Sequence, residues 1–145
     1  MPLTFNPEPF IIEKQGIKIG IASVIDPDVF FFYPDDVKNR VKAADPAEAA
    51  KDVFKKLEAR GVNYSLLIYH GNLEAAKELF RQQDEWDAVL AAHDQTLYEQ
   101  IDGSRIIASP GEEGNRVGKL TLTFRFGKLK TVGSSMRYFK YEEDP

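Results

Sequence analysis

The sequence of 145 residues predicts an α/β fold in which a parallel β-α-β-α-β core is followed by antiparallel hairpins. Short apolar runs at 64–69 and 87–92, each next to a stretch with helical spacing, predict the core. After residue 97 the pattern changes to short alternating runs joined by glycine-containing turns, which predicts the hairpins. The length suits one domain and no linker or repeat divides it, so we expect residues 1–145 to form a single unit.

Composition excludes several classes of function. The chain has 19 Lys and Arg against 23 Asp and Glu, a formal net charge of −4, which gives no reason to expect a nucleic acid partner. There is no cysteine, so disulfides, thiolate metal sites and a cysteine nucleophile are excluded. No apolar run approaches the roughly 18 residues that span a bilayer, and the start lacks the features of a signal peptide. We therefore expect no membrane partner, while the compartment stays open.

The first part of the chain predicts a hairpin and a loop. Residues 10–24 alternate between apolar and polar, turn at Gln15-Gly16 and then become nearly all apolar, which predicts a hairpin that leads into a buried strand. The stretch that follows predicts a loop with an aromatic cluster made of Phe30, Phe31, Phe32 and Tyr33. Two interpretations of this cluster stay open, namely packing at the edge of the sheet and hydrophobic contact with a partner or a missing domain.

A strong helix start follows at Asp45, which can cap the helix, while Pro46 suits the first helical position and Glu48 completes a capping box. Apolar side chains on one face and lysines on the other predict a helix that runs to Arg60, ends at Gly61 and lies on a sheet. The remaining elements are then expected to be a strand at 64–69, a helix at 73–83, a strand at 87–92, strands at 97–101 and 105–109 around a turn at 102–103, a loop at 110–118, strands at 119–126 and 129–138, and a frayed tail at 142–145. Strand-helix-strand order predicts right-handed crossovers in a parallel sheet.

The only two histidines of the chain, His70 and His93, each stand directly after a predicted buried strand. Carboxyl ends of parallel strands meet at one edge of a sheet, and ligands bind at that edge in open α/β sheets. Imidazole is the commonest side-chain ligand for metals, and Gln95 adds an amide oxygen two residues beyond His93. Two interpretations stay open: a joint metal or catalytic site, and polar residues that only leave the core at strand ends.

The ordered set of segments resembles the calcineurin-like metallophosphoesterases, and more narrowly the carboxyl-terminal half of the catalytic domain in their 5'-nucleotidase branch. The segments that carry the resemblance are 16–24, 45–50, 66–71, 87–96 and 117–124. The resemblance implies half of a metallophosphoesterase-type β-sandwich, and a parent activity of metal-dependent hydrolysis of phosphomonoesters such as nucleotides. It also implies divalent cofactors such as Mn²⁺ or Zn²⁺. Relatives are often periplasmic or extracellular.

Carried over residue by residue, the resemblance implies that His70 and His93 bind one metal ion and that Gln95 approaches the other. Arg116 matches a region beside the family's substrate and is a candidate for substrate binding. Its alternative is a solvated arginine that pairs with Glu112 or Glu113.

Two further residues lie next to the histidines. Asn72 is a candidate for binding substrate or for supporting a metal-bound imidazole, with a helix cap as the preferred role. Asp94 is expected to point away from its neighbours His93 and Gln95 and to orient the loop, because side chains alternate along an extended chain.

Three motifs of the family do not occur in the sequence: Asp-x-His, the Gly-Asp that carries the bridging aspartate, and Gly-Asn-His. A bridging carboxylate holds two cations about 3.5–4 Å apart, so we expect no catalytic residue and little or no activity in the isolated chain. The alternative is a non-catalytic binding or assembly module on a degenerate phosphoesterase scaffold. Either case leaves an apolar sheet face that a missing amino-terminal half-domain or a second copy would cover.

Overall fold

The computed structural model describes residues 8–139 of the chain. Its elements are β1 (Phe10–Lys14), β2 (Ile17–Ile25), the 3₁₀ turn η1 (Pro27–Phe30), α1 (Asp35–Lys38), α2 (Pro46–Ala59), β3 (Tyr64–Gly71), α3 (Leu73–Gln82), β4 (Ala88–His93), β5 (Leu97–Asp102), β6 (Arg105–Pro110), β7 (Arg116–Arg125) and β8 (Lys128–Tyr138). Every expected strand and helix is present within a few residues of its expected bounds, and the expected tail at 142–145 lies outside the described residues.

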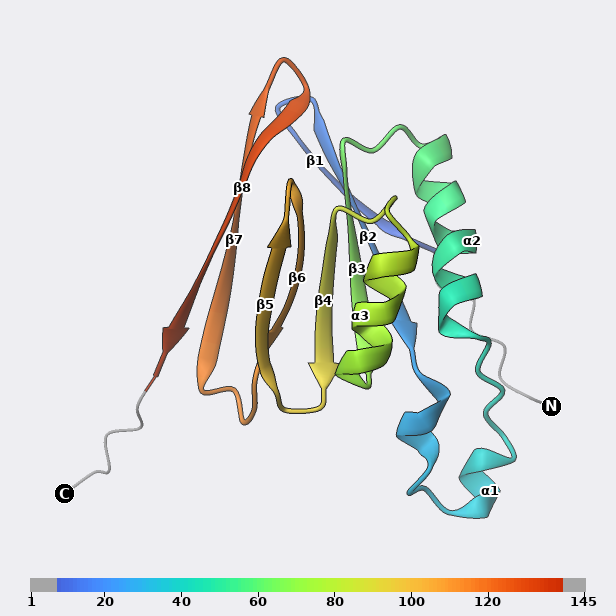
Figure 1. The fold of residues 1–145 in the computed structure, drawn as a ribbon. Helices are drawn as coiled ribbons and strands as arrows, with labels where there is room; N and C mark the ends of the chain where they lie inside the picture. Colours follow the sequence, from blue (N-terminus) through green and yellow to red (C-terminus); the bar gives the residue numbers. More distant parts are fainter. Residues whose placement is uncertain (1–7, 140–145) are drawn as a thin grey trace.

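Six strands form one mixed sheet in the order β1-β2-β3-β4-β6-β5. β2, β3, β4 and β6 run parallel, while β1 and β5 add to the two edges in antiparallel fashion. α2 and α3 pack on one face of this sheet, and a two-stranded sheet of β7 and β8 lies across part of the other face (Figure 1). The predicted parallel core with antiparallel hairpins is confirmed, and the structure adds that β6 returns to the core parallel to β4.

Local chemistry explains how the elements begin. Gln15 and Gly16 take φ values of 53° and 75°, the left-handed pair that a tight hairpin turn between β1 and β2 requires. The Asp45 carboxylate accepts a hydrogen bond from the Glu48 N–H at 2.9 Å, and Pro46 occupies the first helical position, so α2 begins where the sequence predicts.

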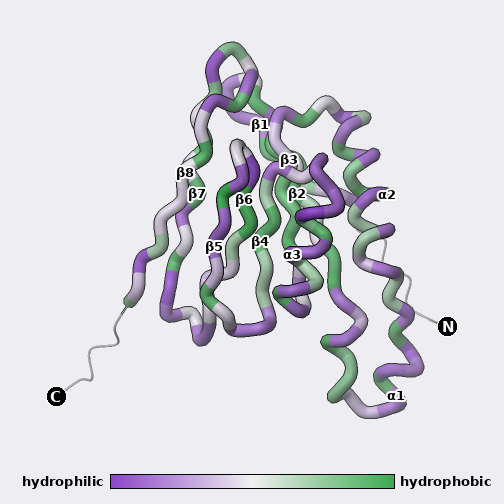
Figure 2. The backbone as a smooth tube through the Cα atoms, viewed as in Figure 1, coloured by the Kyte–Doolittle hydropathy of each residue, from purple (hydrophilic) through white to green (hydrophobic). Residues whose placement is uncertain are grey.

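The central sheet has a core on each face. Between the sheet and the helices lie fully buried side chains such as Leu57, Leu67 and Trp86, and the indole of Trp86 meets the ring of Phe54 edge to face at 5.4 Å. On the opposite face Tyr64, Ala88 and Ile106 pack against apolar side chains of the hairpin, namely Leu120, Leu122, Phe124, Leu129 and Val132. Hydrophobic residues accordingly concentrate on the central strands (Figure 2).

The face of the sheet that meets the hairpin is only partly covered. Ile12 on β1 and Ile68 on β3 keep 45% and 41% of their surface exposed. A groove of about 300 Å³ lies between this face and the hairpin, with Ile68 and Leu90 on one wall and Leu120 and Met136 on the other. The expectation of an incompletely covered apolar face therefore agrees with the structure.

The segment between β2 and α2 differs from the sequence prediction. It contains the short helical elements η1 and α1 where a loop is expected. Packing at the sheet edge is wrong for Phe31, Phe32 and Tyr33, which are 71%, 92% and 51% exposed, because the segment extends beyond the edge of the sheet (Figure 1). Contact of this cluster with a partner stays a prediction. Among residues 8–139, no helix has the length and apolar character needed to cross a membrane.

Candidate functional site

The two histidines lie at the carboxyl ends of neighbouring parallel strands, as predicted. His70 is in register with Ala92, and His93 is in register with Gly71. Residues in register on parallel strands point to the same face, so a regular pleat would direct the two imidazoles to opposite faces of the sheet. Both side chains are exposed to solvent.

The backbone at His93 breaks this pleat. Its φ is 117°, in the region that side chains other than glycine rarely adopt, and Gln95 follows with a φ of 58°. The two imidazole rings lie with their centroids 5.0 Å apart at an angle of 66°. The reversed backbone therefore allows the two side chains to meet at one point of the sheet edge. A residue held in such a conformation costs about 1–3 kcal/mol, and such residues cluster at functional sites.

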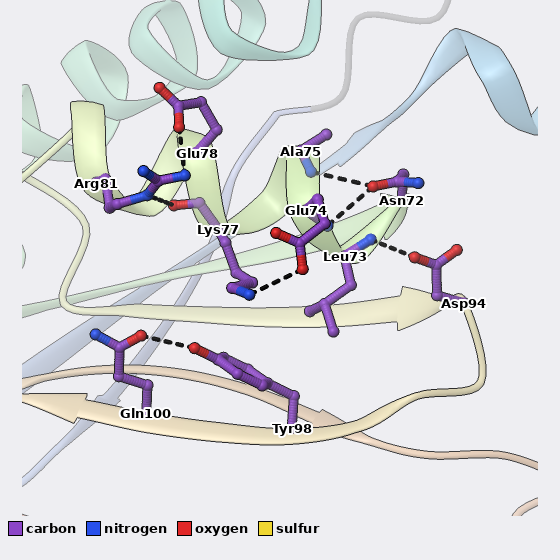
Figure 3. Close-up of polar contacts among 10 residues, drawn as sticks. All are labelled: Asn72, Leu73, Glu74, Ala75, Lys77, Glu78, Arg81, Asp94, Tyr98 and Gln100. Carbon is purple, nitrogen blue, oxygen red and sulfur yellow. Dashed lines mark hydrogen bonds and ion pairs between the residues drawn. The ribbon is translucent and has the colours of Figure 1, made fainter.

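Asp94 and Asn72 fix the loop that carries this turn. The Asp94 carboxylate accepts a hydrogen bond from the Leu73 N–H at the start of α3, and the Asn72 side-chain oxygen accepts from the N–H groups of Glu74 and Ala75 (Figure 3). These N–H groups have no partner within the helix, so both side chains act as caps. The preferred role of Asn72 and the orienting role of Asp94 are confirmed, and substrate binding by Asn72 stays a prediction.

A buried carboxylate supports the edge from the side of β2. Asp26 is 7% exposed, donates its backbone N–H to the carbonyl of His70 at 2.8 Å, and accepts a hydrogen bond from the Tyr69 hydroxyl at 3.0 Å. Gly71 makes room for this contact, because a Cβ built there would lie 2.3 Å from the Asp26 Cβ. Burial raises the pKa of the Tyr69 phenol well above its ordinary value, and the hydrogen bond to Asp26 raises it further. The sequence analysis does not single out Asp26. The signal that could have found it is its position directly after the apolar run of β2.

Arg116 borders the loop of Gln95. A Cβ built on Gly111 would lie 2.8 Å from Nη1 of Arg116 and 3.8 Å from the backbone carbonyl of Gln95, so both groups face the same small space. The guanidinium donates to the Asn115 side chain at 2.9 Å and lies 5.1 Å from the centre of the Tyr138 ring. The ion pairs found among residues 8–139 do not include one between Arg116 and Glu112 or Glu113. Contact of Arg116 with substrate stays a prediction.

The donors at this edge fit part of a metal centre. His70 and His93 offer two imidazoles within 5.0 Å of each other, which suits two ligands of a single first-row metal ion. The nearby carboxylates of Asp94 and Asp26 are engaged elsewhere, by α3 and by Tyr69. Within residues 8–139 no three or more His, Cys, Asp or Glu side chains gather as a metal site. The described part of the chain thus supplies two imidazoles and not a complete ligand set.

The chain was compared with known proteins to identify its fold. No protein-family model and no curated protein matches the chain. Among solved structures, the sulfate thiohydrolase SoxB from Thermus thermophilus matches with a TM-score of 0.81 and 17% identity, over 96% of this chain and 26% of that one. The calcineurin-like phosphoesterase YfkN from Bacillus subtilis matches with a TM-score of 0.73 and 19% identity, over 90% of this chain and 50% of that one.

The chain has part of the calcineurin-like phosphoesterase fold. A putative 5'-nucleotidase from Staphylococcus aureus shares it, with a TM-score of 0.79 and 12% identity over 95% of this chain and 30% of that one. The chain therefore spans between 26% and 50% of the length of these three proteins. The prediction of a partial metallophosphoesterase fold is confirmed. The TM-scores show a shared calcineurin-like phosphoesterase fold. At identities this low they show the fold alone, so activity has to be argued from the site.

Proposed function

We propose that this chain is one half of a metallophosphoesterase-type domain, that it supplies His70 and His93 to the metal centre, and that the completed domain hydrolyses phosphomonoesters. The observation that carries the proposal is the meeting of the two imidazoles at a strand-end edge through a left-handed backbone at His93. Strain of this kind is maintained only where the surrounding structure enforces it. The calcineurin-like phosphoesterase YfkN and the putative 5'-nucleotidase from Staphylococcus aureus have the same fold, which supports the reaction class and nucleotides as substrates.

Each residue of the edge has a proposed role. Divalent ions such as Mn²⁺ or Zn²⁺, when bound, supply Lewis-acid stabilisation of the charge that a phosphoester develops during hydrolysis. His70 and His93 bind through neutral imidazole nitrogens, and Gln95 offers its amide oxygen to a second ion. Arg116 supplies positive charge toward an anionic substrate beside the Gln95 loop. Asn72 can offer only its amide nitrogen, because its oxygen caps α3.

The isolated chain is proposed to be inactive. The described residues hold no complete metal site, and the sequence contains neither an Asp-x-His nor a Gly-Asn-His motif. The missing ligands would come from an amino-terminal half-domain that packs on the partly covered sheet face around Ile12 and Ile68. We propose this half-domain as the partner, with a second copy of the chain as the other occupant to test.

A titration calorimetry experiment tests the proposal. Mn²⁺ and Zn²⁺ are titrated into the wild-type chain, His70→Ala, His93→Ala and the matched control Gln100→Ala, which removes an exposed side chain from β5. We expect binding to the wild type and the control, loss of binding in both histidine variants, and no hydrolysis of an aryl phosphate by any of them. Equal binding by wild type and both histidine variants, or none by the wild type, would contradict the metal role.

A second candidate function is favoured by the aromatic cluster. Phe31 and Phe32 are among the most exposed apolar side chains of the described residues, which is typical of a surface that contacts a partner. A binding or assembly module without catalysis would need this surface and no metal. Replacement of both by serine would then abolish association of the chain in analytical ultracentrifugation while leaving metal titrations unchanged.

A further inference from the structure

The charges of the chain are unevenly distributed. Residues 116–138, which form β7, β8 and their turn, contain no Asp or Glu and six basic residues, namely Arg116, Lys119, Arg125, Lys128, Lys130 and Arg137. The other 122 residues hold the remaining 13 basic and all 23 acidic residues. The hairpin therefore carries a formal charge of +6 on a chain whose remainder carries −10.

This positive charge is open to solvent. Five of the six basic side chains are exposed, and Arg116 is half-buried. The ion pairs found among residues 8–139 all involve other basic residues. Arg116 and Arg125 lie instead over the rings of Tyr138 and Phe126 on the same hairpin. The five exposed basic residues thus form a basic surface on the hairpin, which has no acidic residue of its own.

The hairpin also has open hydrogen-bonding edges. β7 and β8 are ten and eleven residues long and pair, within the described chain, only with each other. The outer edge of each strand therefore presents backbone N–H and C=O groups without a ladder partner. The inner face is already packed on the central sheet through apolar side chains such as Leu120 and Val132. An added strand at either edge would extend this two-stranded sheet and continue its apolar inner face.

We propose that the β7–β8 sheet accepts an extended polypeptide strand in which acidic residues alternate with apolar ones. On the outer face of the extended sheet, the acidic side chains would lie beside Lys119 or Lys130. The apolar side chains would point toward the central sheet. That the half-domain supplies this strand rests on the proposed function. That a strand binds at all, with acidic and apolar residues in alternation, follows from the open edges and the positive charge of the hairpin. A polypeptide is favoured over other polyanions because only a strand uses both the backbone edge and the apolar inner face.

The probe is a fluorescein-labelled peptide of ten residues that alternates glutamate with valine, titrated with the full chain in fluorescence anisotropy. We expect its affinity to fall at least about tenfold as NaCl rises from about 20 mM to about 300 mM, because the attraction is screened. The same peptide with N-methyl groups on alternate residues should bind at least about tenfold more weakly, because strand addition needs main-chain hydrogen bonds. A peptide with lysine in place of glutamate should not bind.

Charge reversal locates the surface. Lys119→Glu on β7 and Lys130→Glu on β8 should each weaken binding at least about threefold, whereas the matched control Lys42→Glu, in the exposed segment before α2, should not. Slower hydrogen exchange of β7 or β8 amides in the complex would identify the edge.

Binding that tolerates N-methylation, or equal competition by a DNA duplex, would overturn strand addition in favour of a general polyanion surface. No binding at low salt would overturn the proposal outright. The His70→Ala variant should bind the peptide normally, which separates this outcome from the metal titration.

Discussion

Replacing His93 by glycine should cost the fold less stability than replacing it by alanine, while both changes remove the proposed metal ligand. At an ordinary position glycine is less stable than alanine by about 0.5–1 kcal/mol, because the unfolded chain gains freedom. At a φ of 117° both histidine and alanine are strained, and relief of that strain is worth about 1–3 kcal/mol. The net expectation is that His93→Gly is more stable than His93→Ala by about 1 kcal/mol.

Alanine is the informative comparison because both variants lose the imidazole and its contact with His70. The two differ in how easily they adopt the left-handed backbone and in the freedom of the unfolded chain. Urea unfolding followed by circular dichroism measures the difference, and about 1 kcal/mol corresponds to a midpoint shift of about 0.5 M at a slope of about 2 kcal/mol per molar urea.

An alanine variant as stable as the glycine variant, or more so, would refute the reasoning, because it would mean that the backbone at this position is not strained. Both variants should lose metal binding in calorimetry. A glycine variant that is more stable than the alanine variant and that also loses binding would show that the edge gives up stability for its function.

Three other substitutions and conditions test the surrounding structure. Gly71→Ala should destabilise the fold by about 1–3 kcal/mol in urea unfolding, because the added Cβ would overlap Asp26. The control Gly118→Ala should change stability by less than about 1 kcal/mol, because its Cβ would meet nothing within 4 Å. Arg105→Met should cost about 1–3 kcal/mol by the same measurement, because the guanidinium donates to three backbone carbonyls around the end of α3; an unchanged midpoint would contradict this role. Burial raises the pKa of Tyr64 and Tyr69, so near pH 10 only the unfolded state loses these two protons. The urea midpoint should therefore decrease as the pH rises from about 9 to about 11.

The strands, the helices and the shared edge of the two histidines follow from the sequence because each depends on short-range patterns. The cap at Asp45, the turn at Gln15-Gly16 and the apolar runs that end at His70 and His93 are such patterns. They fix which elements form and which edge carries the imidazoles.

Other features depend on contacts between distant residues and have no local pattern. The buried position of Asp26 needs the hydroxyl of Tyr69, 43 residues away, and the space left by Gly71. The reversed backbone at His93 is followed directly by Asp94, whose carboxylate accepts from the Leu73 N–H 21 residues away. The charge of the β7–β8 hairpin was available from sequence, but the net charge of the whole chain conceals it.

The hydrogen bond from the Leu73 N–H to Asp94 joins the first turn of α3 to the strained histidine turn. An event that loosens this turn must also release that amide, and an event that tightens it must hold the amide more firmly. The hydrogen exchange of the Leu73 amide therefore reports on how tightly the histidine turn is held. Its rate would register metal or phosphate at the histidines without any label placed in the site.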